Sequence, residues 1–282
     1  MDSRTRDILQ KRLQEGYQMD GSVHVLEGLR LLRQNSLPII ATFLLLGLTG
    51  GWLGAIHWSG FILDALVVTP ILLGGAILML GKAHKGQEPE WKDLLGGLPR
   101  ALHSFLYTIL YSLILLIVLS PTLMAMYQAG VFDFIQEVFA NPNLTEEDIP
   151  DFSNINSTVI WLNLIPFVYL YTGFWWGIYL ILFHGLNALE ALEYSRRLVT
   201  RRWFSHFYLL TIYLFLFMTL GMILSVVAIA MPSIGGVLNV LISALIFFTY
   251  YSSLLVAFDK AVGLEFKEEE QGPDITQHLI DD

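Results

Sequence analysis

The sequence predicts an all-α integral membrane protein, a bundle of six transmembrane helices arranged as three hairpins. Apolar residues make up 55% of the 282 residues and charged residues only 15%, whereas a soluble domain carries about 25% charged residues. The charges are also segregated, because four long stretches of the chain contain a single acid, Asp64, and no basic residue. Finally, all 16 Lys and Arg residues fall in alternate segments between the predicted spans.

The uncharged stretches set the number of spans. An α-helix needs about 20 apolar residues to cross the roughly 30 Å hydrocarbon core of a bilayer. Two of the stretches fit one span each, and two are long enough for a pair. Breaks at 56–60 and 231–236 divide the long ones, and Pro and Gly in the second break favour a turn. The six predicted spans are 37–55, 61–81, 102–126, 159–183, 204–230 and 237–258.

The basic residues predict which way the bundle faces. With six spans, the N-terminus, the loops at 82–100 and 184–203, and the C-terminus together hold every Lys and Arg. The opposite segments, which include an acidic loop at 127–158, hold none. Basic residues near the ends of spans stay in the cytoplasm, so both termini are predicted to be cytoplasmic. A wrong number of spans would scatter the basic residues over both faces.

A short amphipathic segment precedes each predicted pair of spans on the cytoplasmic side. These segments are 22–35, 89–98 and 188–203. Asn187 stands before the third, and Glu190 three residues later completes the pattern of a capping box. The sequence therefore predicts three repeats of an interfacial helix followed by a hairpin. The alternative is that basic amphipathic residues precede outgoing helices without any internal duplication.

Charge and length divide the chain into three parts. Residues 1–21 are predicted to form a cytoplasmic N-terminal segment, and residues 22–263 the six-helix membrane domain. Residues 264–282 contain seven acidic residues and one Lys. This composition predicts a disordered cytoplasmic tail.

The third amphipathic segment carries the best candidate for a binding surface. Its basic cluster consists of Arg196, Arg197, Arg201 and Arg202. An amphipathic helix of this kind lies in the inner-leaflet interface, where each basic residue contributes about 1 kcal/mol of attraction to anionic lipids. Two interpretations stay open. The cluster binds a lipid headgroup or a protein partner specifically, or it serves anchoring and topology alone.

Polar residues inside the spans are the other candidates, because polar groups in hydrocarbon are costly and mark functional sites. Asp64 is the one acid within a predicted span. It either complements the N-terminus of its helix or forms a proton or ion site with His57. Asn163 and Asn239 are further candidates for the lining of a transport path.

Several kinds of chemistry lack support in the sequence. The chain has no Cys, which excludes disulfides, thiolate catalysis and cysteine metal sites. The histidines are too dispersed for a metal motif, and no serine-hydrolase, zinc-protease or Walker A motif occurs. A net charge of −9 gives no support for nucleic-acid binding. We therefore predict no catalytic residue, no metal and no cofactor.

The segment 187–199 and the residues after it carry a family resemblance. The family pattern is an Ala-Leu-x-x-Ser-x-x-Leu-Val helix followed by a phenylalanine-rich span, matched here by Ala191, Leu192, Ser195, Leu198, Val199 and Phe207. On these residues the chain resembles a bacterial superfamily of six-helix membrane proteins of unknown function. One branch is the membrane domain of membrane-anchored glycerophosphodiester phosphodiesterases, whose catalytic barrel has no counterpart here. The resemblance implies a multi-pass module of the bacterial cytoplasmic (inner) membrane without an established activity.

These observations favour a non-enzymatic membrane protein that binds membrane lipids, or a membrane or cytoplasmic protein partner, through its cytoplasmic interfacial helices. The alternative is a small-molecule or ion transporter or channel with helices broken near Pro70, Pro121 or Pro166. A third possibility, an unfamiliar intramembrane enzyme, requires polar residues clustered at one depth, and the sequence shows no such cluster.

Overall fold

The structure is a computed structural model of the whole chain, and it describes residues 3–35, 45, 64–140 and 157–266. These residues form helices and turns, without a strand among them, which confirms the all-α prediction for this part of the chain. The predicted first span at 37–55, apart from Leu45, lies outside the described residues, as does His57.

The described helices follow one another in a simple order. They are α1 (Ser3–Glu15), α2 (Gly21–Gln34), the π-helical turn η1 (Asp64–Val68), α5 (Thr69–His84), the 3-10 turns η2 (Trp91–Leu95) and η3 (Leu98–Arg100), α6 (Ala101–Gln128), α7 (Val131–Ala140), α8 (Ser157–Gly173), α9 (Gly177–His184), α10 (Ala188–Arg201), α11 (Trp203–Ala230) and α12 (Pro232–Ala261). Only Met231 separates the last two helices, and Pro232 stands at the first position of α12, where its missing N–H is not needed.

Four segments are long and apolar enough to cross a membrane: Trp91–Gln128, Ser157–His184, Trp203–Val227 and Val237–Ala261. They coincide with the third to sixth predicted spans, so the structure is compatible with a membrane-embedded protein. The second predicted span corresponds to η1 and α5. It is not among the four segments found within the described residues.

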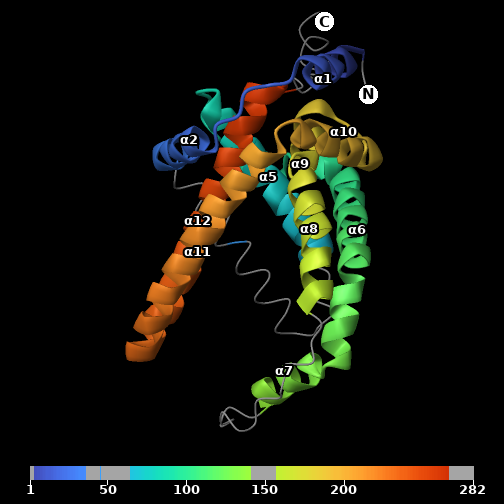
Figure 1. Ribbon diagram of the computed structural model, residues 1–282. Helices are drawn as coiled ribbons and strands as arrows, with labels where there is room; N and C mark the ends of the chain where they lie inside the picture. The colour runs from blue at the N-terminus through green and yellow to red at the C-terminus, as the bar shows by residue number, and fades with distance from the viewer. Residues whose placement is uncertain (1–2, 36–44, 46–63, 141–156, 267–282) are drawn as a thin grey trace, which may run out of the picture.

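The helices are arranged in two arms that diverge from one end of the molecule (Figure 1). One arm contains α11 and α12, which pack along each other, and the other contains α6 and α8. At the end where the arms meet lie α1, α2, α10 and the C-terminal end of α12. We call this the basic end, because the Lys and Arg residues of the described chain belong to the segments gathered there. The acidic helix α7 lies at the opposite end.

The core of the protein is concentrated at the basic end. Trp176, which stands just before α9, is fully buried, as are Tyr179 and Phe183 of α9 and Phe258 near the end of α12. Farther from this end the helices expose large apolar side chains, such as Ile229, which is 85% exposed. In water such a continuous apolar surface would favour aggregation, whereas a bilayer covers it with lipid.

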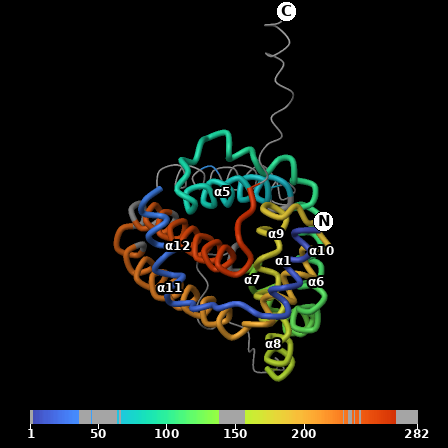
Figure 2. Tube along the Cα trace, turned by 90° about the horizontal axis from the view of Figure 1, so that it is seen from above, coloured from blue at the N-terminus to red at the C-terminus, as the bar shows by residue number. Residues whose placement is uncertain are grey.

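Helix α2 packs across α12, and Figure 2 shows this crossing from above. Gly28 makes the close approach possible, since a Cβ built there would lie 2.8 Å from the backbone nitrogen of Ser253. Lys260 of α12 adds an ion pair with Glu27 of α2, with both carboxylate oxygens 2.7 Å from its Nζ. The first predicted interfacial segment is therefore held against the last predicted span.

Three elements differ from the sequence prediction. The segment 89–98, predicted as a helix, forms the two 3-10 turns η2 and η3 instead. Gly96 and Gly97, which are poor helix formers, lie between these turns. The predicted fourth span at 159–183 is interrupted at residues 174–176, which form a turn between α8 and α9. A further helix, α1, forms within the N-terminal segment, for which the sequence analysis predicted none.

Candidate functional site

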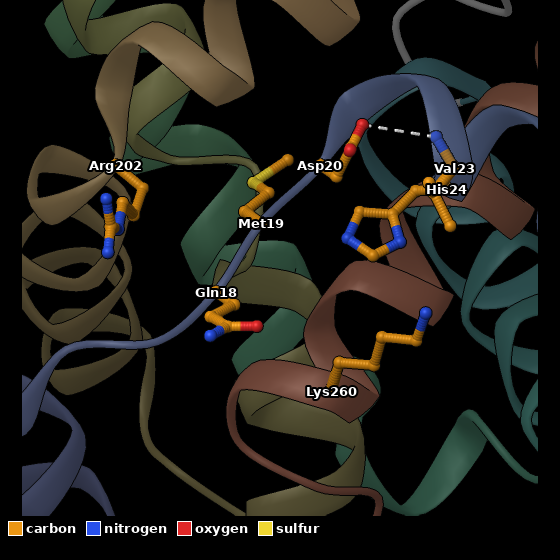
Figure 3. Close-up of a pocket in the computed structure, with 7 residues that line it drawn as sticks. All are labelled: Gln18, Met19, Asp20, Val23, His24, Arg202 and Lys260. Carbon is orange, nitrogen blue, oxygen red and sulfur yellow. Dashed lines mark hydrogen bonds between the residues drawn. The ribbon is translucent and has the colours of Figure 1, made fainter.

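A pocket opens at the basic end, where the linker between α1 and α2 passes over the start of α11 (Figure 2). Its volume is about 340 Å³, and its lining residues are Gln18, Met19, Asp20, Val23, His24, Arg202 and Lys260 (Figure 3). A second pocket of about 310 Å³ shares Met19 and Asp20 with the first. It is completed by Gly21, Phe204, Ser205 and Tyr208. The linker thus borders both pockets, and the second adds two aromatic side chains from the start of α11, Phe204 and Tyr208.

Tyr17 fixes the linker against the helices beneath it. Its hydroxyl donates to the carbonyl of Leu198, 3.0 Å away, and lies 2.9 Å from Nε2 of His206. Since the hydroxyl proton goes to Leu198, the phenol oxygen accepts from the histidine. Burial raises the pKa of Tyr17 far above its ordinary range, so the phenol stays protonated. The Tyr17 carbonyl in turn accepts from Nε of Arg202 at 2.9 Å.

The structure divides the predicted arginine cluster into two pairs. Arg196 and Arg197 both bind Glu193, at 3.0 and 2.6 Å. The hydrogen bond from Arg196 is the main reason that the pKa of Glu193 is lowered. Arg201 and Arg202 have no acidic partner among the described residues. Only Arg202 lines the pocket.

Arg202 faces a different set of charges on the other side of the pocket (Figure 3). Asp20 caps α2, and its Oδ1 accepts from the backbone N–H groups of Ser22 at 3.0 Å and Val23 at 3.3 Å. The hydrogen bond from the Ser22 hydroxyl is the main reason that the pKa of Asp20 is lowered, and the backbone N–H groups of Val23 and Ser22 add to it. Lys260 also lines this side, but its charge is balanced by Glu27.

His24 differs from the other lining residues, because its side chain is buried and only one of its two ring nitrogens has a hydrogen-bond partner among the described residues. The residue is 2% exposed. Its Nδ1 lies 3.4 Å from a carboxylate oxygen of Glu27, and its Nε2 has no hydrogen-bond partner in the described part of the chain. Burial lowers the pKa of His24 below its ordinary value of 6.5, so the ring is neutral at pH 7. A buried polar atom without a partner is rare, and this one belongs to a side chain that lines the pocket.

No family model matches the chain, and neither a curated protein nor a solved structure matches it. The resemblance to six-helix bacterial membrane proteins therefore stays a prediction.

The structure gives a physical role to Ser195, the serine at the centre of the sequence pattern that carries this resemblance. Ser195 is fully buried in α10. Its hydroxyl accepts from the backbone N–H of Trp176 at 3.1 Å and donates to the carbonyl of Gly173 at 2.8 Å. It thus satisfies both ends of the break between α8 and α9.

Helix α10 is fixed at both ends. The side chain of Asn187 accepts from the backbone N–H of Glu190 at 2.9 Å, which confirms the predicted cap. Just beyond its other end, Nε1 of Trp203 donates to Oγ1 of Thr172 at 2.8 Å. The Arg196–Arg202 segment is therefore held rigidly beside the break in the fourth span.

Within the described part of the chain, the polar candidates predicted to lie in the spans form no hydrogen bond with one another. Asp64 accepts from Thr69 at 3.2 Å, Asn163 donates to the carbonyl of Val159 at 2.8 Å, and Asn239 accepts from Ser243 at 3.1 Å. Each of these bonds stays within one helix or its first turn, and neither pocket is lined by Asp64, Asn163 or Asn239. The described residues also contain no group of three or more His, Asp or Glu suited to hold a metal.

Sequence reasoning missed the linker side of the pocket. Asp20 had a readable signal, since an Asp before an apolar periodic run predicts a helix N-terminus. His24 and Lys260 had none. They reach the pocket only because α2 packs on α12.

Proposed function

We propose that the chain is a multi-pass membrane protein that binds the headgroup of a glycerophospholipid at its basic end, with this end on the cytoplasmic side. The observation that carries the proposal is the position of Arg202. Its guanidinium has no acidic partner among the described residues and borders a pocket that adjoins a second one, lined in part by Phe204 and Tyr208. The planar fork of a guanidinium matches the oxygens of a phosphate.

The surroundings of Arg202 suit the headgroup level of a bilayer. Trp203 follows directly and stacks on Phe207, with ring centroids 5.0 Å apart. Tryptophan is enriched at the boundary between hydrocarbon and water. The apolar helix α11 begins at this residue, so Arg202 lies where a span leaves the hydrocarbon.

The second pocket supplies a path for an acyl chain. Phe204 is 80% exposed and Tyr208 is 53% exposed, one turn apart on α11. Farther along the same helix, Phe215 and Met222 are also exposed. A lipid with its phosphate at Arg202 is therefore able to lay a chain along α11 without leaving apolar surface.

Replacing Arg202 tests the proposal, and Arg201 provides a matched control. Arg201 is the neighbouring exposed arginine and does not line the pocket. The full chain is purified in detergent, and binding of a short-chain phospholipid is measured by native mass spectrometry. We expect Arg202→Gln to weaken binding about tenfold, as for the loss of a charge-assisted hydrogen bond, and Arg201→Gln to leave it unchanged. Equal binding by both variants would refute the proposal.

Transport remains the alternative prediction. The break at residues 174–176 resembles the discontinuous helices of transporters, but Ser195 already satisfies its free backbone groups. The break therefore offers no spare carbonyl or N–H group at these two positions for an ion, and it favours no second function.

A further inference from the structure

We infer that the pocket selects a zwitterionic headgroup that carries a primary ammonium beside its phosphate, the chemistry of phosphatidylethanolamine. This inference rests on the proposed function and adds the class of lipid to it. The evidence is the arrangement of charges and hydrogen-bond acceptors around the pocket.

The charges of the lining residues favour a ligand with no net charge. Arg202 contributes one cation without an acidic partner among the described residues. Lys260 is paired with Glu27 through two contacts of 2.7 Å, and Asp20 contributes one carboxylate. Its Oδ1 is used by the α2 cap, while its Oδ2 has no hydrogen-bond partner among the residues that the structure describes. The pocket thus presents one positive and one negative group.

His24 adds a hydrogen-bond acceptor next to Asp20. A carboxylate at this pH only accepts hydrogen bonds, so the hydrogen in the 3.4 Å contact with Glu27 lies on Nδ1 of His24. In a neutral ring the other nitrogen is then an acceptor. Nε2 of His24 is therefore a buried acceptor that lacks a donor among the described residues, and a ligand ammonium supplies one.

The cation of Arg202 and the two acceptors, Asp20 and His24, lie on opposite sides of the pocket. Figure 3 shows Arg202 on one side and Asp20, His24 and Lys260 on the other, with the His24 ring edge directed toward the space between them. A phosphate placed at Arg202 directs its ethanolamine arm across this space. A headgroup with a quaternary ammonium has no N–H to donate to His24. An anionic headgroup has no cation to place beside Asp20.

Three short-chain lipids separate these possibilities. The probes are the dioctanoyl forms of phosphatidylethanolamine, phosphatidylcholine and phosphatidylglycerol, each titrated onto the full chain in detergent. The test variant is Asp20→Asn, since Asn caps a helix as well as Asp does and removes only the charge. Asp133→Asn, on α7 at the opposite end, is the control. His24→Phe removes the acceptor at similar size.

The unmodified chain should bind the ethanolamine lipid most tightly. Asp20→Asn should lower the ratio of the affinity for the ethanolamine lipid to that for the glycerol lipid about threefold, which is the size of effect expected for an exposed ion pair. His24→Phe should lower the ratio of the affinity for the ethanolamine lipid to that for the choline lipid. Headgroup selection is wrong if the chain binds all three lipids equally, or if Asp20→Asn behaves like Asp133→Asn while Arg202→Gln still weakens binding. If Arg202→Gln has no effect on any lipid, the proposed function itself fails.

Discussion

Replacing Ser195 by Ala tests how the broken fourth span is held together. The change removes one hydroxyl and leaves the backbone N–H of Trp176 and the carbonyl of Gly173 without their partner. Both groups lie in a buried region, because Trp176 and Ser195 are fully covered and Gly173 is buried. Water is therefore not available as a replacement.

The expected loss of stability follows from these two groups. Each buried backbone group left unpaired costs about 1–3 kcal/mol, so a value of roughly 3 kcal/mol for the pair is a moderate estimate. That corresponds to a change of roughly 150-fold in the unfolding equilibrium. The assay is unfolding in mixed micelles with rising SDS, followed by tryptophan fluorescence, since Trp175 and Trp176 lie within the break.

Ser225→Ala is the matched control. Its hydroxyl donates to the carbonyl of Gly221 at 2.8 Å within the exposed face of α11, where that carbonyl belongs to a continuous helix. We expect a change below about 0.5 kcal/mol. If Ser195→Ala were as stable as Ser225→Ala, the turn would close on itself without the serine. The role given to Ser195 would then be wrong.

Three further predictions concern packing, pH and topology. Gly28→Ala should cost about 1–3 kcal/mol, measured in the same micelle titration, because its methyl group meets the backbone of Ser253. Binding of the ethanolamine lipid is measured from about pH 8 to about pH 5. The affinity should stay constant above pH 6.5, because burial keeps the pKa of His24 below that value. It should weaken at lower pH, as His24 takes up a proton and no longer accepts a hydrogen bond from the ligand. Single cysteines at Gln10 and Glu137 should be labelled from opposite sides of the membrane, and labelling from one side would refute the six-span layout.

The controls for these predictions come from the same chain. Gly221→Ala should be nearly neutral, because a Cβ there meets no atom within 4 Å. The pH effect should vanish in His24→Phe, and a profile unchanged by this variant would contradict it. The carboxylates that face His24 stay ionised in this range. Hydrogen bonds lower the pKa of Asp20. Burial opposes the ionisation of Glu27, but the bond from Lys260 lowers its pKa overall.

The direction of the pH effect on stability follows from the same pKa. Burial holds the pKa of His24 in the folded chain below its ordinary value of 6.5. The unfolded chain therefore binds a proton at a higher pH than the folded chain does. The contribution of His24 to stability is complete above pH 6.5 and is lost as the pH falls toward the folded pKa. Arg202 and Lys260 also line the pocket with His24, and His206 lies behind Tyr17.

Some features of this protein were readable from the sequence because they depend on local rules. The four long apolar helices follow from runs of uncharged residues that exceed the thickness of a bilayer. The cap at Asn187 and Glu190 follows from two side chains three residues apart. The orientation of the basic end and the number of spans stay predictions.

The pocket was not readable, because it is built from contacts between distant parts of the chain. Tyr17 and His206 are 189 residues apart, and Glu27 and Lys260 are 233 residues apart. The break in the fourth span also depends on a partner elsewhere, since Ser195 lies 22 residues after Gly173. A hydropathy profile of 159–183 contains no sign of that serine. The four arginines likewise differ through distant partners, since Glu193 pairs with Arg196 and Arg197 while Arg202 donates to the carbonyl of Tyr17.

The most direct test of lipid binding at the basic end is an experimental density map of the chain in a bilayer of phosphatidylethanolamine and phosphatidylglycerol. We predict one ordered headgroup in the pocket, with phosphate oxygens about 2.8 Å from the Arg202 guanidinium and its amine toward Asp20 and His24. A pocket that holds only water, with ordered lipid confined to other surfaces, would contradict this function.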